Sequence, residues 1–563
     1  MGMDPVTQEI IEGKLIATVD EMGIVMAKTS MSPVIYEVLD FACGILTPQG
    51  DLVAQMNGIT LFTGTFGAQV KSLLRQFDGQ IDPGDILLTN DPYAGGTHAC
   101  DFAIVRPVFI DGILAAIAIN VAHYLDVGGA VPGSVPPNAT SVFQEGLRLP
   151  GVKIARGDRL NDELVHIIRE NVRLPEIAMG DLNAQIATVR IAETRIREMA
   201  GKYGAATLSA AFQQMLDSSE RLARAAIMDL PDGDYTARDV IDGDGVTDAA
   251  IPLTVTLRVR GDQLEVDFTG CPPATDGPIN CARGALQSAV KTVFKALVAP
   301  QAPSNDGWFR PLVVTAPDDT IFTARKPKPT GWYYEGSVHA SEMVWQALAG
   351  LCPDRFSAGS YASLCATYIS GTGTDGRPFI HVEPQHGGWG ATADWDGTAG
   401  LIALTDGDTY NYSVEVIEAK FPLRVTRYGL NTEGGVGAGE YRGGYGLVRE
   451  YDVLAPGCVV HASFGRTRTL PWGMAGGQPG SANAMERVFP DGRIDSHGRF
   501  TGLQLDQGDK VRLVTGGGGG WGDPARRDPA AVLRDVHDGL LTHERAARDY
   551  PQTRPHAVTG DTP

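Results

Sequence analysis

Glycine and proline are spread along the whole chain instead of being collected in linkers. They account for 69 and 35 of the 563 residues. Glycine supplies the left-handed backbone conformations that many tight turns need, and proline fixes the backbone angle at early turn positions. Turns at this frequency favour short strands between them. The chain is therefore expected to be β-rich with long functional loops, and its length predicts two to four subdomains.

Two helical regions are expected to interrupt this pattern. Asp4 and Pro5 combine an N-cap with the residue favoured at the first helical position. An apolar stripe then predicts a helix to about residue 26; its members are Val6, Ile10, Leu15, Val19 and Met22. Residues 160–225 keep rough helical spacing, with a break near Gly204. These segments predict an N-terminal helix and a central helical segment.

Short apolar or alternating segments predict strands. Those expected in one N-terminal sheet are 44–46, 51–54, 85–88, 103–109 and 113–121, with turns at 48–50, 83–84 and 111–112. Residues 251–268 alternate and predict a β-hairpin. Residues 285–298 predict a helix, and residues 300–460 predict short strands with Gly-rich turns.

The expected fold class is α+β: a β-rich, multi-subdomain fold with an N-terminal helix, a metal-bearing sheet and a central helical segment. We expect five regions along the chain. They are an N-terminal α/β metal-site region (1–158), a helical segment (159–228), a β-hairpin and helix region (229–300), a β-rich, Gly-rich C-terminal region (301–527) and a polar tail (528–563) that is expected to be frayed.

Charge and cysteine content exclude several classes of protein. The formal net charge of −20 argues against nucleic acid as a partner, since phosphate binding needs a basic face. We find neither an apolar run long enough for a bilayer nor a secretory signal at the start, so no membrane association and a cytoplasmic location are expected. The seven cysteines are odd in number and form no Cys-x-x-Cys pair, which fits a reducing compartment without disulfides.

Two His-x-x-Asp units lie close together and each has glycine pairs beside it. They run from His98 to Asp101 and from His123 to Asp126. Imidazole nitrogen and carboxylate oxygen are ligands for a divalent metal such as Zn, Mn or Fe. His123 also falls at the carboxyl end of a predicted strand, where functional groups commonly meet solvent. The alternative is that His98 and Asp101 cap a turn and His123 fills a strand end.

With these motifs in view, the chain resembles the hydantoinase B family, which includes the B components of N-methylhydantoinase-type enzymes. It is also similar to the C-terminal half of 5-oxoprolinase and to the α subunits of acetone and acetophenone carboxylases. Motifs in the same order carry the resemblance: Asp4-Pro-Val-Thr-Gln-Glu-Ile, Leu39-Asp-Phe-Ala-Cys, Asn90-Asp-Pro-Tyr-Ala-Gly-Gly-Thr-His, Phe143-Gln-Glu-Gly-Leu-Arg-Leu-Pro, Gly180-Asp-Leu-Asn-Ala-Gln, Gly277-Pro-Ile-Asn, Gly443-Gly-Tyr-Gly-Leu-Val-Arg-Glu and Thr515 to Pro524.

The resemblance implies a two-component, ATP-dependent system that forms a hetero-oligomer. A hydantoinase A-type partner carries the ATP site and phosphorylates the substrate oxygen, and the B component holds a divalent metal. His98, Asp101 and His123 match the family's metal positions, and Asp40 is the expected fourth ligand, although a turn aspartate is the alternative. One observation from the residues agrees with this division: the chain has no Gly-x-x-x-x-Gly-Lys-Ser/Thr phosphate loop.

Three functions remain open at this point. The first is the metal-bearing subunit of a cyclic amide hydrolase that opens a hydantoin, lactam or 5-oxoproline-like ring. The second is the α subunit of an ATP-dependent ketone carboxylase; such subunits are expected to be longer, so the length favours the hydrolase. The third is a scaffold subunit with structural histidines.

Further residues are candidates for chemistry. Glu145 is a candidate general base for the attacking water, with a loop salt bridge as the alternative. Asp126 is expected to orient His123, to contact substrate or to cap the next loop. Asp181 and Gln185 are one helical turn apart and favour a surface pair over a place in the pocket.

Three segments have weaker functional interpretations. The run 516–520 suggests either an anion nest or, preferably, a close-packed turn or subunit contact. His381 and His386 resemble a second metal pair, and the alternative is a Gly-rich turn that is structural or faces substrate. The segment 326–335 departs from the family pattern, and its aromatic residues 332–334 predict a substrate-facing surface that favours an apolar ring or chain.

Overall fold

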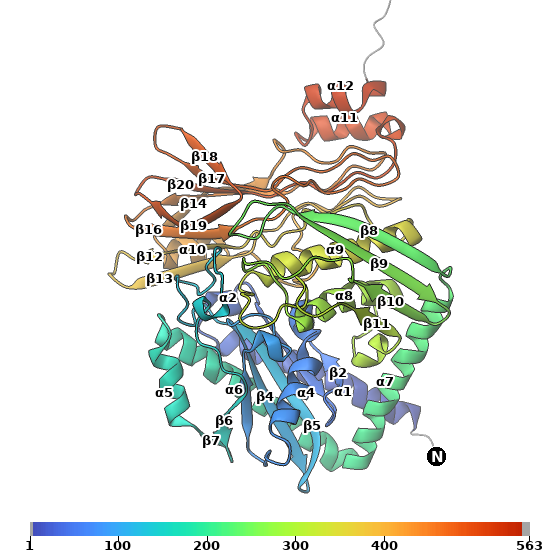
Figure 1. The fold of residues 1–563 in the computed structure, drawn as a ribbon, viewed down its shortest axis with the longest axis vertical. Coiled ribbons are helices and arrows are strands. Elements are labelled where there is room, and N and C mark those ends of the chain that lie inside the picture. Colours follow the sequence, from blue (N-terminus) through green and yellow to red (C-terminus); the bar gives the residue numbers. More distant parts are fainter. Residues whose placement is uncertain (1–3, 554–563) are drawn as a thin grey trace, which may run out of the picture.

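The computed structural model describes residues 4–553, and its first layer is a seven-stranded antiparallel sheet (Figure 1). Its order is β2-β1-β5-β4-β3-β6-β7. The strands are β1 (Phe41–Leu46), β2 (Leu52–Gln55), β3 (Ile86–Thr89), β4 (Asp101–Ile110), β5 (Ile113–His123), β6 (Val152–Arg156) and β7 (Arg159–Leu160). All five segments predicted for one N-terminal sheet are found in it, and His123 ends the longest strand as expected.

Helices cover this sheet. α1 packs on α6 and against β1 and β2, and α6 lies across β4 and β5. The helices of this part are α1 (Pro5–Thr29), α2 (Pro33–Tyr36), α3 (Thr60–Thr63), α4 (Phe66–Gln76), α5 (Asp162–Glu170), α6 (Pro175–Tyr203) and α7 (Ala205–Met228), with 3₁₀ turns η1 (Pro92–Ala94) and η2 (Val142–Gln144). The predicted break near Gly204 is confirmed, because this residue separates α6 from α7 with a positive φ of 89°.

The start of α1 confirms one prediction and corrects another. The Asp4 carboxylate accepts a hydrogen bond from the N–H of Thr7, so Asp4 caps the helix as expected. The predicted stripe is wrong in its first turns, since Val6 and Ile10 are exposed and Ile11 is buried instead. The buried positions 8, 11, 15, 18, 19, 22 and 26 keep regular helical spacing, and Val6 and Ile10 lie off this stripe.

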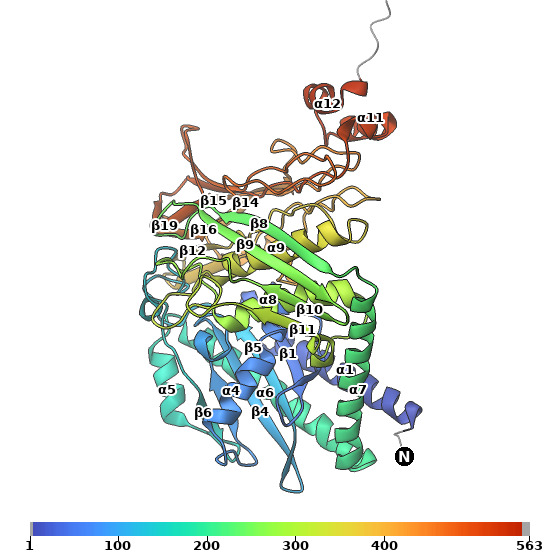
Figure 2. The same cartoon turned by 45° about the vertical axis from the view of Figure 1, so that its right-hand side comes forward.

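A second sheet forms the middle layer (Figure 2). Its order is β11-β10-β9-β8, and the predicted hairpin is β9 with β10. The elements are β8 (Gly233–Ile241), β9 (Ile251–Arg260), β10 (Gln263–Asp267), β11 (Leu312–Thr315), α8 (Arg283–Val298), α9 (Tyr333–Leu351) and η3 (Asp306–Phe309). Helix α9 was not predicted. Fifteen of its residues are buried, and they include Glu335, His339 and Glu342, so burial along this helix does not follow the division into polar and apolar residues from which a helix is predicted.

The C-terminal layer holds two further sheets, of order β13-β12-β16-β19 and β14-β15-β20-β17-β18. Its elements are β12 (Thr367–Thr372), β13 (Pro378–Glu383), α10 (Val414–Lys420), β14 (Leu423–Leu430), β15 (Leu447–Val453), β16 (Cys458–Ser463), β17 (Ala484–Val488), β18 (Ile494–His497), β19 (Arg499–Leu505), β20 (Lys510–Val514), η4 (Pro524–Arg526), α11 (Pro529–His537), α12 (His543–Asp549) and η5 (Pro551–Thr553). The α+β fold class with several sheets is confirmed.

The glycine run 516–520 is packed backbone to backbone against neighbouring loops. A Cβ on Gly518 would lie 2.1 Å from the carbonyl oxygen of Trp389, and one on Gly519 would lie 2.0 Å from that of Trp472. The five N–H groups of the run donate to acceptors in other segments of the chain. The close-packed alternative is therefore confirmed and the anion nest is wrong, because these donors are already used.

The polar tail is ordered over most of its described length. α11 and α12 form a small core that includes Val532, Ala546 and Tyr550. Asp535 accepts hydrogen bonds from Arg442 and Arg527. The predicted fraying is therefore wrong for residues 529–549, and the rest of that prediction, 554–563, lies outside the described residues. Among residues 4–553, no helix combines the length and the apolarity that crossing a membrane requires.

Candidate metal centre

Three side chains predicted as metal ligands meet at the end of the β4–β5 hairpin. Asp101 and His123 are directly opposite each other in the strand register, and His98 lies in the loop that leads into β4. His98 Nε2 is 2.9 Å from Asp101 Oδ1 and 3.1 Å from His123 Nδ1, and His123 Nδ1 is 3.0 Å from Asp101 Oδ1. All three residues are at least 96% buried, since their exposed fractions are 2%, 3% and 4%. The structure thus brings the predicted set together as one triangle of donor atoms.

The donor set fits a divalent ion. Ligands at about 2.1 Å and at right angles around an octahedral ion lie about 3 Å from each other. The triangle has this spacing. His98 Nδ1 is 2.9 Å from the carbonyl oxygen of Gly331, so Nδ1 carries a proton and donates it to that carbonyl. In this tautomer the lone pair of Nε2 faces Asp101. Two lone pairs that face each other at 2.9 Å require a proton or a cation between them.

Electrostatics favours a cation at the same place. Burial alone would raise the pKa of Asp101, but the charge of His98 and hydrogen bonds from both histidines hold it well below its usual range. Burial opposes the charged form of His98, yet Asp101 outweighs this and raises the pKa of His98. His123 Nε2 is buried without a hydrogen-bond partner in the described part of the chain. Cys100, which the sequence did not suggest, places its Sγ within 4.8 Å of donor atoms of both histidines.

A small cavity of about 40 Å³ adjoins the triangle. Asp40, the predicted fourth ligand, lines it from the position just before β1, where its carbonyl accepts a hydrogen bond from the N–H of His123. Burial raises the pKa of Asp40 to about 7, against the attraction of His123. The other lining residues are Val34, Ile59, Phe62, Tyr333, Tyr334, Leu364, Ala366, Tyr368, Val382, Pro384, Asp406 and Thr409. They come from all three layers, so the cavity lies where these layers meet.

Two of the three aromatic residues at 332–334 lie at this cavity. Tyr333 and Tyr334 line the cavity, and the Tyr333 hydroxyl is 3.5 Å from Asp101 Oδ2. Trp332 instead points into the protein and donates its indole N–H to Val135. Asp406 was missed. It also lines the cavity but is far in sequence from the predicted ligands, and burial raises the pKa of its carboxyl to about 7.

Glu145 lies behind His98 rather than in the cavity. Its carboxylate accepts from the N–H of Thr330 at 2.9 and 3.1 Å and from that of Gly331 at 2.6 Å. Burial raises the pKa of Glu145 to about 7, against these hydrogen bonds. The same Gly331 offers its carbonyl to His98. This geometry favours a positioning role through the 330–331 peptide over the predicted role as a general base.

Asp126 is engaged in the loop that follows β5. Its carboxylate accepts from the N–H groups of Gly128, Gly133 and Arg173 and from the Arg173 guanidinium. Of the alternatives for this residue, the structure shows the loop cap, and the expected contact with His123 is not among its hydrogen bonds within residues 4–553.

Two other pairs differ from expectation. Asp181 and Gln185 are buried, not on the surface: Asp181 binds the N–H groups of Met31 and Ser32, and Gln185 binds the Tyr124 hydroxyl. The i,i+4 pattern could not show this because α6 is covered on two sides. His381 and His386 do not form a metal pair, because each imidazole has a different partner. His381 Nε2 is 3.5 Å from Glu383 Oε2, and His386 Nε2 is 3.1 Å from the Thr409 carbonyl oxygen.

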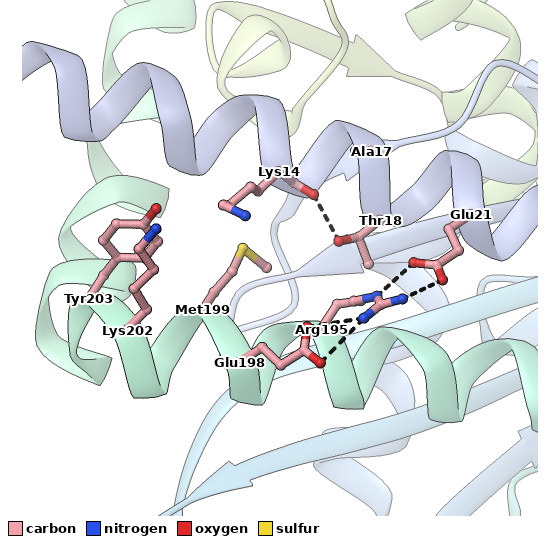
Figure 3. Close-up of a pocket in the computed structure, with 9 residues that line it drawn as sticks. All are labelled: Lys14, Ala17, Thr18, Glu21, Arg195, Glu198, Met199, Lys202 and Tyr203. Carbon is pink, nitrogen blue, oxygen red and sulfur yellow. Dashed lines mark hydrogen bonds and ion pairs between the residues drawn. The ribbon is translucent and has the colours of Figure 1, made fainter.

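A larger surface hollow of about 310 Å³ lies between α1 and α6 (Figure 3). Arg195 crosses it to bind Glu21 at 2.7 Å and Glu198 at 3.1 Å. The charged residues that line this hollow are exposed or partly exposed, so it lacks the buried, convergent donors of the first cavity.

The chain matches the family model of hydantoinase B/oxoprolinase over residues 4–524. It is 31% identical to the B-type component of a putative D-/L-hydantoinase of Pseudomonas sp., over 98% of this chain and 95% of the relative. It is 30% identical to the beta chain of the caprolactamase of Pseudomonas jessenii, over 97% of this chain and 96% of the relative.

Solved structures agree. The crystal structure of ATP-dependent caprolactamase from Pseudomonas jessenii has a TM-score of 0.91 at 28% identity and covers 97% of this chain and 96% of its own. Nucleotide-free acetone carboxylase has a TM-score of 0.89 at 20% identity, covering 97% and 79%, and shows the shared fold alone. The resemblance expected from the sequence motifs is thereby confirmed: the chain belongs to the hydantoinase B/oxoprolinase family.

Proposed function

We propose that this chain is the metal-bearing subunit of an ATP-dependent cyclic amide hydrolase. The observation that carries the proposal is the triangle of His98 Nε2, Asp101 Oδ1 and His123 Nδ1 with sides of about 3 Å beside a buried cavity. The named relatives support the reaction class, since they include components of a hydantoinase and of a caprolactamase.

His98, Asp101 and His123 would hold a divalent ion, with Asp40 as a fourth ligand. Such an ion, when bound, polarises a substrate oxygen and lowers the pKa of water. An unactivated amide is a poor electrophile, so we propose that a hydantoinase A-type partner first phosphorylates its oxygen with ATP, which provides a leaving group.

The chain's own residues would do the remaining work. The Gly331 carbonyl holds the His98 ring in one tautomer and orientation, and Glu145 fixes that peptide. Tyr333 and Tyr334 close one side of the cavity. Apolar walls exclude bulk water, which strengthens the electrostatic interactions at the donor triangle.

The direct test is turnover by the complex. The chain is purified with its hydantoinase A-type partner and supplied with ATP, a divalent metal and a panel of lactams, hydantoins and ketones, with and without bicarbonate. Ring opening that needs ATP but not bicarbonate is expected. Incorporation of bicarbonate carbon into product would contradict the hydrolase and indicate a ketone carboxylase.

A variant tests the ligand set. His123→Ala is expected to lose bound metal while keeping the wild-type circular dichroism spectrum, because it removes one of three ligands at the end of a strand. Full metal occupancy in this variant would show that the ligands are misassigned. Normal turnover without metal would show that the histidines have a structural role, as in the scaffold alternative.

A further inference from the structure

We propose that a second polar pocket, which adjoins α3 as the metal cavity does, binds hydrogen phosphate. Its volume is about 100 Å³. Ile59 and Phe62 line the metal cavity, while Thr60 and Thr63 line this pocket, so the α3 turn has a different face at each. The inference goes beyond the proposed function, because it assigns a binding site outside the metal centre.

Two lysines make the pocket positive. Lys291 and Lys295 are one helical turn apart on α8, and both line it. The Lys291 ammonium pairs with Asp306 at 3.0 Å. Lys295 has no carboxylate partner within residues 4–553, and its ammonium donates to the carbonyls of Ala299 and Ala302. Asp306 is the one acid among the lining residues, so the pocket has one positive charge in excess.

The surroundings of Lys295 favour an anion beside it. Burial lowers the pKa of Lys295 to about 8, and its ammonium lies 5.1 Å from the centre of the Trp308 ring. Two of its three N–H groups bind carbonyls, which leaves one donor. A partly buried ammonium whose charge has no opposite partner gains stability when an anion binds next to it.

Neutral donors and the size of the pocket define what kind of anion fits. Gln55 and Ser304 line it with an amide and a hydroxyl, and neither side chain forms a hydrogen bond in the described part of the chain. Together with Lys295 they offer N–H and O–H groups to a small oxyanion. The pocket has room for several water molecules or one tetrahedral oxyanion, but not for a nucleotide.

Asp306 distinguishes phosphate from sulfate. Its Oδ1 accepts from Lys291, and its Oδ2 accepts from the N–H of Leu52 at 2.8 Å. A carboxylate has about four lone-pair sites, so acceptor capacity remains. HPO₄²⁻ keeps one O–H that can donate to this carboxylate. Sulfate has no proton and would meet it only as a like charge, so the pocket should prefer hydrogen phosphate.

The reactivity of the Lys295 amine tests the inference at this site. The full-length protein, in a buffer free of oxyanions at about pH 8, is treated with a trace of an acetylating reagent. Acetylation of each lysine is then measured by peptide mass spectrometry. An anion beside Lys295 raises its pKa and covers its amine, so binding slows the reaction.

Phosphate and sulfate are compared at equal ionic strength. With a dissociation constant of about 1 mM, about 10 mM inorganic phosphate should slow acetylation of Lys295 about tenfold. The same concentration of sulfate should slow it less than about twofold, because its dissociation constant is expected to be at least about tenfold higher. Lys14, in the hollow between α1 and α6, is the internal control and should react at an unchanged rate.

Two variants locate the anion. Asp306→Asn keeps an acceptor oxygen for Leu52 but removes the charge, so phosphate and sulfate should then protect Lys295 to within about threefold of each other. His123→Ala, which is expected to lose the metal, should keep the protection by phosphate, because the pocket shares no residue with the donor triangle.

Three results would overturn the inference: acetylation of Lys295 that phosphate leaves unchanged, equal protection by sulfate in the wild type, or protection that disappears in His123→Ala and so places the phosphate at the metal. If Asp306→Asn does not fold, the comparison of phosphate with sulfate in the wild type still decides. The outcome is independent of the proposed function, because phosphate binding is measured without turnover.

Discussion

Replacing Glu145 with glutamine distinguishes a positioning role from a direct part in the chemistry. Glu145 binds two backbone N–H groups, of Thr330 and Gly331, and the Gly331 carbonyl in turn binds His98. Glutamine keeps the shape of the side chain, but it removes the charge and replaces one acceptor oxygen by an NH₂ donor. The donor cannot satisfy another N–H, so the 330–331 peptide loses part of its support.

The size of the effect follows from these contacts. A hydrogen bond to a charged group contributes about 1.5–3 kcal/mol and a neutral one about 0.5–1.5 kcal/mol. Two backbone donors therefore lose about 2 kcal/mol of support in total. If that support orients His98, metal affinity should fall by about 10- to 100-fold, as it does when groups behind a ligand are removed.

The assay is a competition titration of Zn²⁺ or Mn²⁺ against a chromogenic chelator, with circular dichroism as a check on folding. Glu342→Gln is the matched control. Glu342 is also a buried glutamate with a pKa of about 7, and it accepts from the N–H of Ser360, not from the 330–331 peptide. It should leave metal affinity unchanged.

Two results would refute the positioning role. Equal metal losses in both variants would indicate a general loss of stability. Wild-type metal affinity in Glu145→Gln together with lost turnover would instead support the general base that the sequence suggested.

Two further predictions concern stability. Burial raises the pKa of Glu342 from 4.5 to about 7, against the charge of Arg466. The stability that this carboxyl contributes is therefore present below pH 4.5 and is lost as pH rises through 7, a loss of about 3 kcal/mol. In urea titrations, Glu342→Gln should reduce the fall in unfolding free energy between pH 5 and 8 by about 3 kcal/mol. An unchanged pH slope would contradict it. Gly518→Ala should destabilise the protein by about 3 kcal/mol or more, because the added Cβ would lie 2.1 Å from the carbonyl oxygen of Trp389. Gly13→Ala should instead raise stability by about 0.5–1 kcal/mol, because Gly13 lies within α1 with open space around it. Equal melting temperatures for the two glycine variants would refute the packing argument.

Local signals predicted the fold where the sequence has two clearly different faces or a strong terminus. The Asp4 N-cap, the Gly204 break and the Arg260-Gly-Asp262 hairpin turn are of this kind, because a few neighbouring residues determine them. Helix α9 gave no such signal, since Glu335 and Glu342 are as buried as its apolar residues. α11 and α12 were missed although each has a local start signal, the Asp528 cap before Pro529 and the Thr542 cap. The partners that hold them are distant in sequence, such as Arg442, which binds Asp535.

The same distinction applies to the site. His98, Asp101 and His123 could be found from their spacing and residue types. Asp406 and the Gly331 carbonyl could not, because they approach the triangle from segments hundreds of residues away. The contacts of Glu145 could not be predicted for the same reason, since only tertiary packing brings the 330–331 peptide beside its carboxylate.

The arrangement of His98, Asp101 and His123 depends on one irregularity in the β4–β5 hairpin. From the turn, Ile110 pairs with Ile113 and Phe109 with Leu114, but Val108 then pairs with Ala116, so Ala115 is an extra residue. Without this bulge, regular pairing would place Asp101 opposite Ala122. Directly opposed residues share a face and neighbours alternate, so His123 would then point to the other side of the sheet from Asp101.

This bulge is what puts an imidazole and a carboxylate from two strands on one face, 3.0 Å apart. Bulges are common beside functional sites because they re-aim a side chain without changing the rest of a strand. The sequence could not reveal it. Residues 113–119 are apolar without interruption, so no alternation of polar and apolar residues marks where the register shifts by one. The residue types of the candidate site could therefore be predicted from the sequence. The orientation that brings His123 and Asp101 together is a property of the hairpin.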